Sequence, residues 1–141
     1  MIENGDREGP DGLLGAADSP SWAVRAAAGR RLAASADMPG VEGVLRRLLL
    51  DEWDTAVTQE TAEALLERRD AIGLRLVLGA LAVADDDTAD ELDAALACVF
   101  QPSGDAAAQL ELLCGELASD LDAGVRREAA TILLRLRPSS G

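Results

Sequence analysis

The sequence predicts an all-α protein built from paired helices, and three observations support that prediction. The 141 residues are 48% apolar but only 2% aromatic, and they are rich in alanine, leucine, glutamate and arginine, which are strong helix formers. Apolar residues recur at spacings of three and four, which is the helical period. Whole segments also recur at an offset of 33 residues, which is typical of repeat architectures. A chain of this length fits one domain with one core.

The repeat is clearest at residues 54–56 and 87–89, which both read Asp-Thr-Ala. The same offset aligns four segments, which begin at Trp22, Thr55, Thr88 and, after two extra residues, Ala123. Apolar residues then fill fixed columns, which hold Leu32, Leu65, Cys98 and Leu133; Val44, Val77 and Leu110; and Leu48, Leu81 and Cys114. We therefore expect these columns to face a shared core, with both cysteines buried as small apolar side chains.

The period predicts seven helices in chain order, at residues 20–35, 40–51, 54–68, 70–83, 87–100, 104–119 and 122–136. The first helix of each pair follows acidic side chains that can accept the unpaired N–H groups of a helix start, namely Asp18, Asp54, Asp87, Asp120 and Asp122. Pro39, Gly40, Pro102 and Gly104 mark turns between paired helices. Residues 12–137 are thus expected to form a single domain between two mobile tails, residues 1–11 and 138–141.

The charged residues exclude several classes of enzyme. The chain has 26 acidic and 13 basic residues, all of the basic ones are arginine, and there is no histidine, lysine or tyrosine. Catalysis that depends on imidazole, a Schiff-base lysine or a phenol is therefore excluded. The net charge of −13 disfavours binding to nucleic acids and anionic membranes, and it favours a partner with a basic surface.

The location of the protein is predicted to be the cytoplasm. The first ten residues lack the apolar region of a signal peptide, and no apolar stretch reaches the ~18 residues that a membrane span needs. Two cysteines in such a chain are expected to be free thiols in a reducing compartment. The composition, in which arginine is the only basic residue and alanine is abundant, indicates a GC-rich bacterial source.

Two segments resemble the first helix of a HEAT repeat, whose pattern is D-x-x-x-V-R-x-A-A. Residues 18–28 read DSPSWAVRAAA and residues 120–130 read DLDAGVRREAA. The second unit departs from the pattern at Thr58, and the third departs at Asp90 and Glu91. The resemblance covers residues 18–136. It implies a right-handed α-solenoid of about three and a half stacked antiparallel helix pairs, with second helices on the concave side. HEAT-type proteins typically act as scaffolds, although minority branches are phycobilin lyases or alkyl-purine DNA glycosylases.

The columns expected on the concave side combine small and apolar residues with arginines. The first set is Gly43, Leu76, Gly79, Ala80 and Leu112, and the arginines beside it are Arg46, Arg47 and Arg75. One interpretation is a shallow groove for a partner's helix or peptide. The other is close helix packing, with the arginines in a solvated face balanced by nearby acids. Trp53 falls in a turn outside the core columns, where it is either a binding residue or packs under the adjacent loop.

Acidic clusters at residues 51–54 and 85–93 raise the question of a metal site. Counted from Asp85, the sixth residue of an EF-hand loop would be Asp90 and the twelfth Leu96, whereas the loop requires glycine and glutamate there. The cysteines lack a second set of ligands, since no CxxC motif or histidine is present. We therefore expect helix capping, and the sequence predicts no metal or cofactor.

The predicted function is that of a non-enzymatic interaction module, or adaptor, that binds a partner protein on its concave face. An immunity or regulatory protein for a basic partner is one form of this prediction. The alternatives are an enzyme of the glycosylase-like or lyase-like branches and a structural repeat protein that self-associates. The last helix has no partner helix after it, so we expect a monomer or a weak dimer through that helix.

Overall fold

The computed structural model describes residues 10–101 and 104–136. The elements in these ranges are α2 (Pro10–Ala16), α3 (Trp22–Leu32) followed by the 3₁₀ turn η1 (Ala33–Ser35), α4 (Val41–Leu49), α5 (Thr55–Glu67), α6 (Ala71–Leu81), α7 (Asp86–Val99), α8 (Gly104–Leu117) and α9 (Ala123–Leu136). No residue in the described ranges forms a strand. The prediction of an all-α fold is therefore confirmed. Within the same ranges, no helix is both long and apolar enough to cross a bilayer.

The seven predicted helices match α3 to α9, and the sequence did not predict α2. The expected tail extends to residue 11, whereas α2 begins at Pro10, a residue type that suits the first position of a helix. Leu13 and Leu14 pack partly buried against the core. This helix is short and contains two glycines, so its apolar period is weak. The rest of the predicted tails, residues 1–9 and 138–141, lies outside the described residues.

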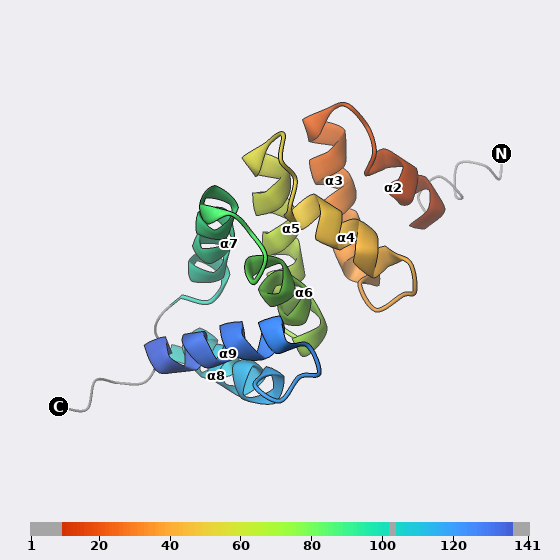
Figure 1. The fold of residues 1–141 in the computed structure, drawn as a ribbon. Coiled ribbons are helices and arrows are strands. Elements are labelled where there is room, and N and C mark those ends of the chain that lie inside the picture. The colour runs from red at the N-terminus through yellow and green to blue at the C-terminus, as the bar shows by residue number, and fades with distance from the viewer. Residues whose placement is uncertain (1–9, 102–103, 137–141) are drawn as a thin grey trace.

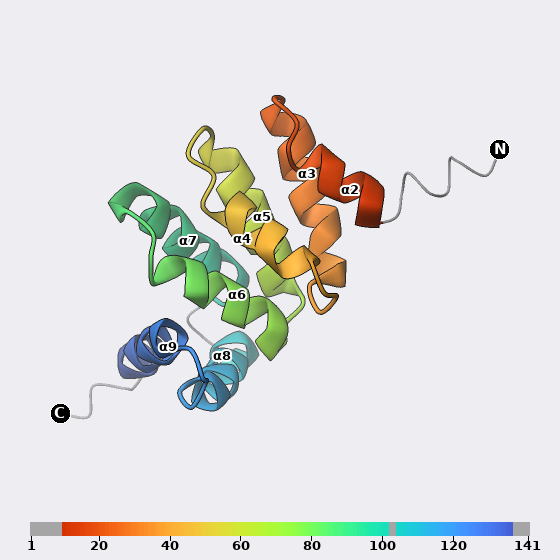
Figure 2. The ribbon, with the colours of Figure 1, turned by 45° about the vertical axis from the view of Figure 1, so that its right-hand side comes forward.

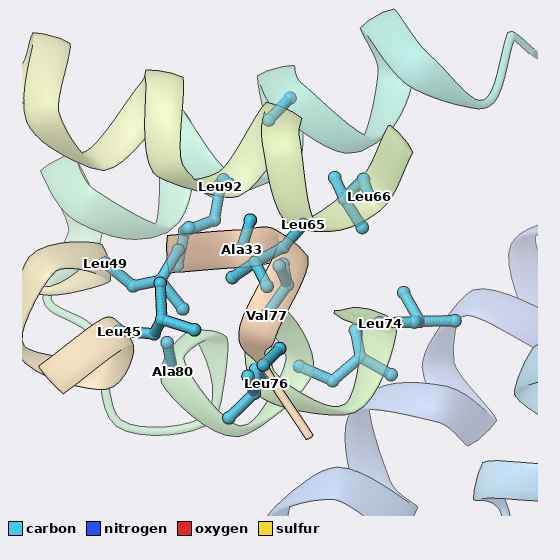
Figure 3. Close-up of a cluster of buried hydrophobic side chains, with 14 of the residues drawn as sticks. Ala33, Leu45, Leu49, Leu65, Leu66, Leu74, Leu76, Val77, Ala80 and Leu92 are labelled. Carbon is cyan, nitrogen blue, oxygen red and sulfur yellow. The ribbon is translucent and has the colours of Figure 1, made fainter. Parts of the chain in front are cut away.

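Three helices, α3, α5 and α7, lie side by side with their N-terminal ends at the same edge (Figures 1 and 2). α4 and α6 form a second layer across them. The core fills the space between the layers, where leucines of α4, α5, α6 and α7 meet (Figure 3). Leu45, Leu65 and Leu92 are each fully buried there.

The regular stacking ends after α7. A further repeat would place α9 alongside α7, but α9 packs against α8 and α6 instead, and the α8–α9 pair crosses beneath the other helices (Figure 1). The third copy of the repeat has Asp90 and Glu91 where the pattern has valine and arginine. Carboxylates are costly to bury without a cationic partner. This side of α7 is therefore unsuited to packing against α9.

The predicted burial of the cysteines is confirmed for only one of the two. Cys114 is buried as expected, but Cys98 is exposed, so the prediction of burial was wrong for Cys98. With Asp90 and Glu91 near solvent, α7 turns Leu92, Leu96 and Val99 inward. Cys98 consequently falls on the outer side of the helix.

The two thiols are expected to differ in reactivity. Burial raises the pKa of the Cys114 thiol to about 12, so almost no thiolate forms there near neutral pH. In the native protein, a thiol reagent such as Ellman's reagent should modify Cys98 quickly and Cys114 only after unfolding. The Cys98→Ser variant should show almost no native labelling. Equal labelling of both thiols would contradict the core described above.

Candidate functional site

The most exposed aromatic side chain of the described residues is Trp53, which lies in the turn between α4 and α5 and is 83% exposed. The Asp51 carboxylate fixes this turn, because its Oδ2 accepts the backbone N–H groups of Trp53 at 3.1 Å and Asp54 at 2.8 Å. Asp54 in turn caps α5 by accepting the N–H of Ala56 at 2.8 Å. The backbone on both sides of the indole is thus anchored while its ring faces solvent. The prediction that Trp53 lies outside the core is confirmed.

A buried ion pair holds this turn against the start of α3. Arg25 donates Nε to Asp51 Oδ1 at 3.0 Å and Nη2 to Oδ2 at 3.3 Å, and the two side chains are only 10% and 7% exposed. The remaining nitrogen, Nη1, donates to the carbonyl of Ser19 at 2.9 Å. A bidentate pair of this kind is geometrically specific. Arg25 therefore connects the α2–α3 turn to the α4–α5 turn.

Two open hollows flank the tryptophan. The first has a volume of about 480 Å³ and lies between the two turns, and its lining includes Asp18, Ser19, Val44, Arg47 and Trp53. The second, about 540 Å³, lies along α4 and is lined by Gly43, Arg46, Arg47, Leu50, Asp51, Glu52 and Trp53. We call Gly43, Arg46, Arg47 and Trp53 the Trp53 platform. These four residues were all predicted to bind a partner.

The three arginines of the predicted site each face a carboxylate. Arg47 Nη1 lies 3.1 Å from Asp18 Oδ1, and Arg46 Nη2 lies 4.0 Å from Glu42 Oε2. Arg75 Nη1 lies 3.4 Å from the same Glu42. Arg46 and Arg47 point outward as predicted, and the interpretation in which nearby acids balance them agrees with these contacts.

Arg75 also binds the turn before α9. Its Nε donates to Asp120 Oδ1 at 2.9 Å. This hydrogen bond raises the pKa of Arg75 and lowers the pKa of Asp120, which is also lowered by the N–H of Asp122. Arg75 is therefore part of the contact between α6 and the α8–α9 pair, and it is less available to a partner than predicted.

The other predicted residues do not form a groove. Leu76 is 2% exposed and Ala80 is fully buried, and Figure 3 shows both within the buried cluster. Their place in an accessible concave floor was therefore a wrong prediction, because both side chains belong to the core between the two layers of helices. Gly79 lies near Arg46 and Val125. Leu112 is 73% exposed on α8 but lines neither hollow beside Trp53.

Sequence reasoning missed four residues that build the site, namely Asp18, Ser19, Arg25 and Asp51. Asp18 and Arg25 belong to the repeat pattern, and Asp51 was assigned to a capping cluster. A buried arginine needs an anionic partner, so the arginine of the pattern was a signal for a carboxylate on a neighbouring turn. The spacing along the chain does not say which carboxylate it is.

The predicted capping is confirmed for Asp54 and Asp122. It was wrong for Asp18 and Asp87, because Ser21 caps α3 and Asp85 caps α7. Asp54, Asp85 and Asp122 each accept an N–H of the following helix start, and so does Asp70 before α6. For Asp70, burial alone would raise the pKa, but hydrogen bonds from the N–H of Gly73 and from Arg68 outweigh it, and the pKa is lowered. Among the described residues, no three acidic or cysteine side chains lie together as a metal site would require.

These lowered pKa values predict a loss of stability in acid. Because the pKa of Asp120 is below its ordinary value of 3.8 in the folded state, the unfolded chain takes up the proton first as the pH falls. The stabilisation is present above that value and is lost as the pH drops through the folded pKa. The urea concentration at the midpoint of unfolding should therefore fall as the pH is lowered from about 5 to about 2. In the Asp120→Asn variant the midpoint should fall less over the same pH range. An equal fall in both proteins would contradict the contact between Arg75 and Asp120.

The site has an exposed indole and carboxylates on an anchored turn, and the guanidinium groups of Arg46 and Arg47 on the adjoining helix α4. Indole and guanidinium groups are enriched at protein interfaces, where they contribute by packing and charge. No family model, no curated protein and no solved structure matches this chain.

Proposed function

We propose that the protein is a non-enzymatic interaction module that binds a partner protein through the Trp53 platform. The observation that supports this function best is a tryptophan exposed to 83% on a turn whose backbone is tied down by Asp51. Tryptophan is among the residues that contribute most to protein interfaces. A rigid anchor loses little conformational entropy on binding, and this favours affinity.

The fold we propose for this module is a short HEAT-like α-solenoid. The side-by-side arrangement of α3, α5 and α7 supports it, as does the second layer formed by α4 and α6. On this proposal, the partner binds at the edge where the first helices begin rather than on a concave floor. We also propose a cytoplasmic location, because the exposed Cys98 thiol suits a reducing compartment.

The charges around the platform favour a partner with a basic surface. Asp18, Glu52 and residues 85–87 are exposed acids at the N-terminal ends of α3, α5 and α7, and these ends share one edge (Figures 1 and 2). Trp53 lies on the same edge. Complementary charge mainly increases the association rate and the specificity, while burial of the indole would supply most of the binding energy.

The test is to identify the partner and then to measure its affinity. A photo-reactive amino acid at position 52, beside the indole, should cross-link the partner in cells. Once that partner is purified, Trp53→Ala should weaken binding about 30-fold or more while changing the free energy of unfolding by about 0.5 kcal/mol or less, as expected for an exposed side chain.

Leu112→Ala is the matched control, because Leu112 is also exposed but lies outside the platform. It should leave the affinity unchanged. If Trp53→Ala binds like the unmodified protein while Leu112→Ala does not, the platform is not the binding site.

A further inference from the structure

A second surface lies on the side of α7 that faces away from α5. α7 packs along α5 on one side and also touches α6. No helix of residues 10–101 or 104–136 runs along the other side, because the α8–α9 pair lies beneath the C-terminal end of α7 (Figures 1 and 2). The layer of α3, α5 and α7 therefore ends at an uncovered helix.

The uncovered side of α7 carries a row of carboxylates. Asp86, Asp90, Asp93 and Ala97 follow one another at spacings of four, three and four residues, which places them in one stripe along the helix. Asp86, Asp90 and Ala97 are exposed and Asp93 is partly exposed. Asp85 is the residue that caps the helix. Asp90 and Asp93 lie beyond the first turn, where stabilisation by the helix dipole has faded, so capping does not explain them.

An apolar socket lies at the end of this stripe. It has a volume of about 200 Å³, and α7, α8 and α9 contribute its lining, which consists of Leu96, Ala97, Phe100, Leu110, Ile132 and Leu136 with Asp93 and Arg135. Arg135 Nη1 lies 3.9 Å from Asp93 Oδ1. Pockets for small organic ligands measure about 300–1,000 Å³, so this one is small for such a ligand. Its size and lining suit a single apolar side chain.

We propose that the stripe and the socket together bind an amphipathic helix of a partner protein, with basic residues along the stripe and one aromatic or aliphatic side chain in the socket. Charge complementarity supports this occupant, because the stripe presents Asp86, Asp90 and Asp93 on a chain of net charge −13. A second copy of this chain would bring further carboxylates to the stripe and is disfavoured for that reason. The bound helix would extend the layer of α3, α5 and α7.

This surface is separate from the Trp53 platform, since the two share no residue. The inference therefore goes beyond the proposed function and does not depend on it. A protein with both surfaces would connect two partners, one at the N-terminal edge and one at the α7 flank.

The test uses the full chain and a synthetic helical peptide. The peptide carries three lysines at the spacings of the stripe and a phenylalanine four residues further on, and a second peptide has the reverse order to allow for either direction of the helix. Fluorescence anisotropy should show binding of one of the two, weakened by salt. Replacing the phenylalanine with alanine should weaken that binding about tenfold or more.

Two variants with the same added charge separate site binding from general attraction of a basic peptide to an acidic protein. Ala97→Arg closes the socket, while Ala108→Arg places the same side chain at an exposed position of α8 outside it. We expect Ala97→Arg to weaken binding about tenfold or more. The peptides with phenylalanine and with alanine should then bind this variant equally. Adding Asp90→Asn to Ala97→Arg should weaken binding little further. Ala108→Arg should retain most of the affinity, and Trp53→Ala should retain all of it.

Methyl NMR adds a direct readout on the folded chain. The Ile132 methyl signals should shift on addition of the peptide, whereas those of Ile72, which does not line the socket, should not. Equal binding by the Ala97→Arg and unmodified proteins, or an unshifted Ile132 signal at saturation, would overturn the proposal. So would failure of both peptides to bind.

Discussion

Replacing Asp51 with alanine is expected to lower the free energy of unfolding by about 3–5 kcal/mol, which is the usual cost of removing one partner of a buried ion pair. Arg25 would keep its charge in a position that is 10% exposed. The N–H groups of Trp53 and Asp54 would also lose their acceptor. Urea denaturation followed by circular dichroism measures this loss. Because the turn would no longer be anchored, partner binding at Trp53 should weaken too.

Asp18→Ala is the control for that experiment. It removes a carboxylate from an ion pair with Arg47 in which the side chains are 65% and 61% exposed, and exposed pairs contribute about 1 kcal/mol or less. If the two alanine variants lose similar amounts of stability, the Arg25–Asp51 pair does not have the structural role assigned to it.

The second large effect is expected for Gly73→Ala. A Cβ at this position of α6 would lie 2.1 Å from the carbonyl oxygen and 2.9 Å from the carbonyl carbon of Leu65. Both are backbone atoms, so no side-chain rotation relieves the clash, and the turn between α5 and α6 would have to open. We expect a loss of about 3 kcal/mol or more. Thermal denaturation should show this as a lower melting temperature.

Gly43→Ala is the matched control, because Gly43 has the same place relative to the start of α4 that Gly73 has relative to the start of α6. A Cβ at Gly43 meets nothing within 4 Å. Alanine there should stabilise the protein by about 0.5–1 kcal/mol, since glycine is a poor helix former. The two substitutions should therefore have opposite signs. A stabilised Gly73→Ala variant would contradict the close approach of α5 and α6.

The sequence predicted local features well, because these depend on neighbours along the chain. The helical period located α3 to α9, and the predicted caps Asp54 and Asp122 accept N–H groups at helix starts. At α7 the cap is Asp85, two residues before the predicted Asp87. The place of Trp53 outside the core followed from its position in a turn between repeats, although the sequence left open whether its ring is exposed or packs under the adjacent loop. Each of these inferences needs only residues within a few positions of one another.

The features that the sequence did not predict depend on contacts between distant segments. The α8–α9 pair packs on α6, and Arg75 of α6 donates to Asp120 in the turn before α9. Leu76 lies in the buried cluster and not on the expected groove floor. Arg25 finds its carboxylate 26 residues further on, at Asp51. The acids at Asp90 and Glu91 were noted as departures from the repeat, yet their effect on the packing of α7 appears only when the neighbouring helices are placed.

If a partner covers the Trp53 indole, the fluorescence of this residue will report the change in its surroundings. In the Trp22→Phe variant, Trp53 is the only tryptophan, and its emission should be that of a solvent-exposed indole that acrylamide quenches efficiently. Saturation with the partner cross-linked at position 52 should shift the emission to shorter wavelength and reduce the quenching. Unchanged emission and quenching in the saturated complex would show that the partner does not cover this indole.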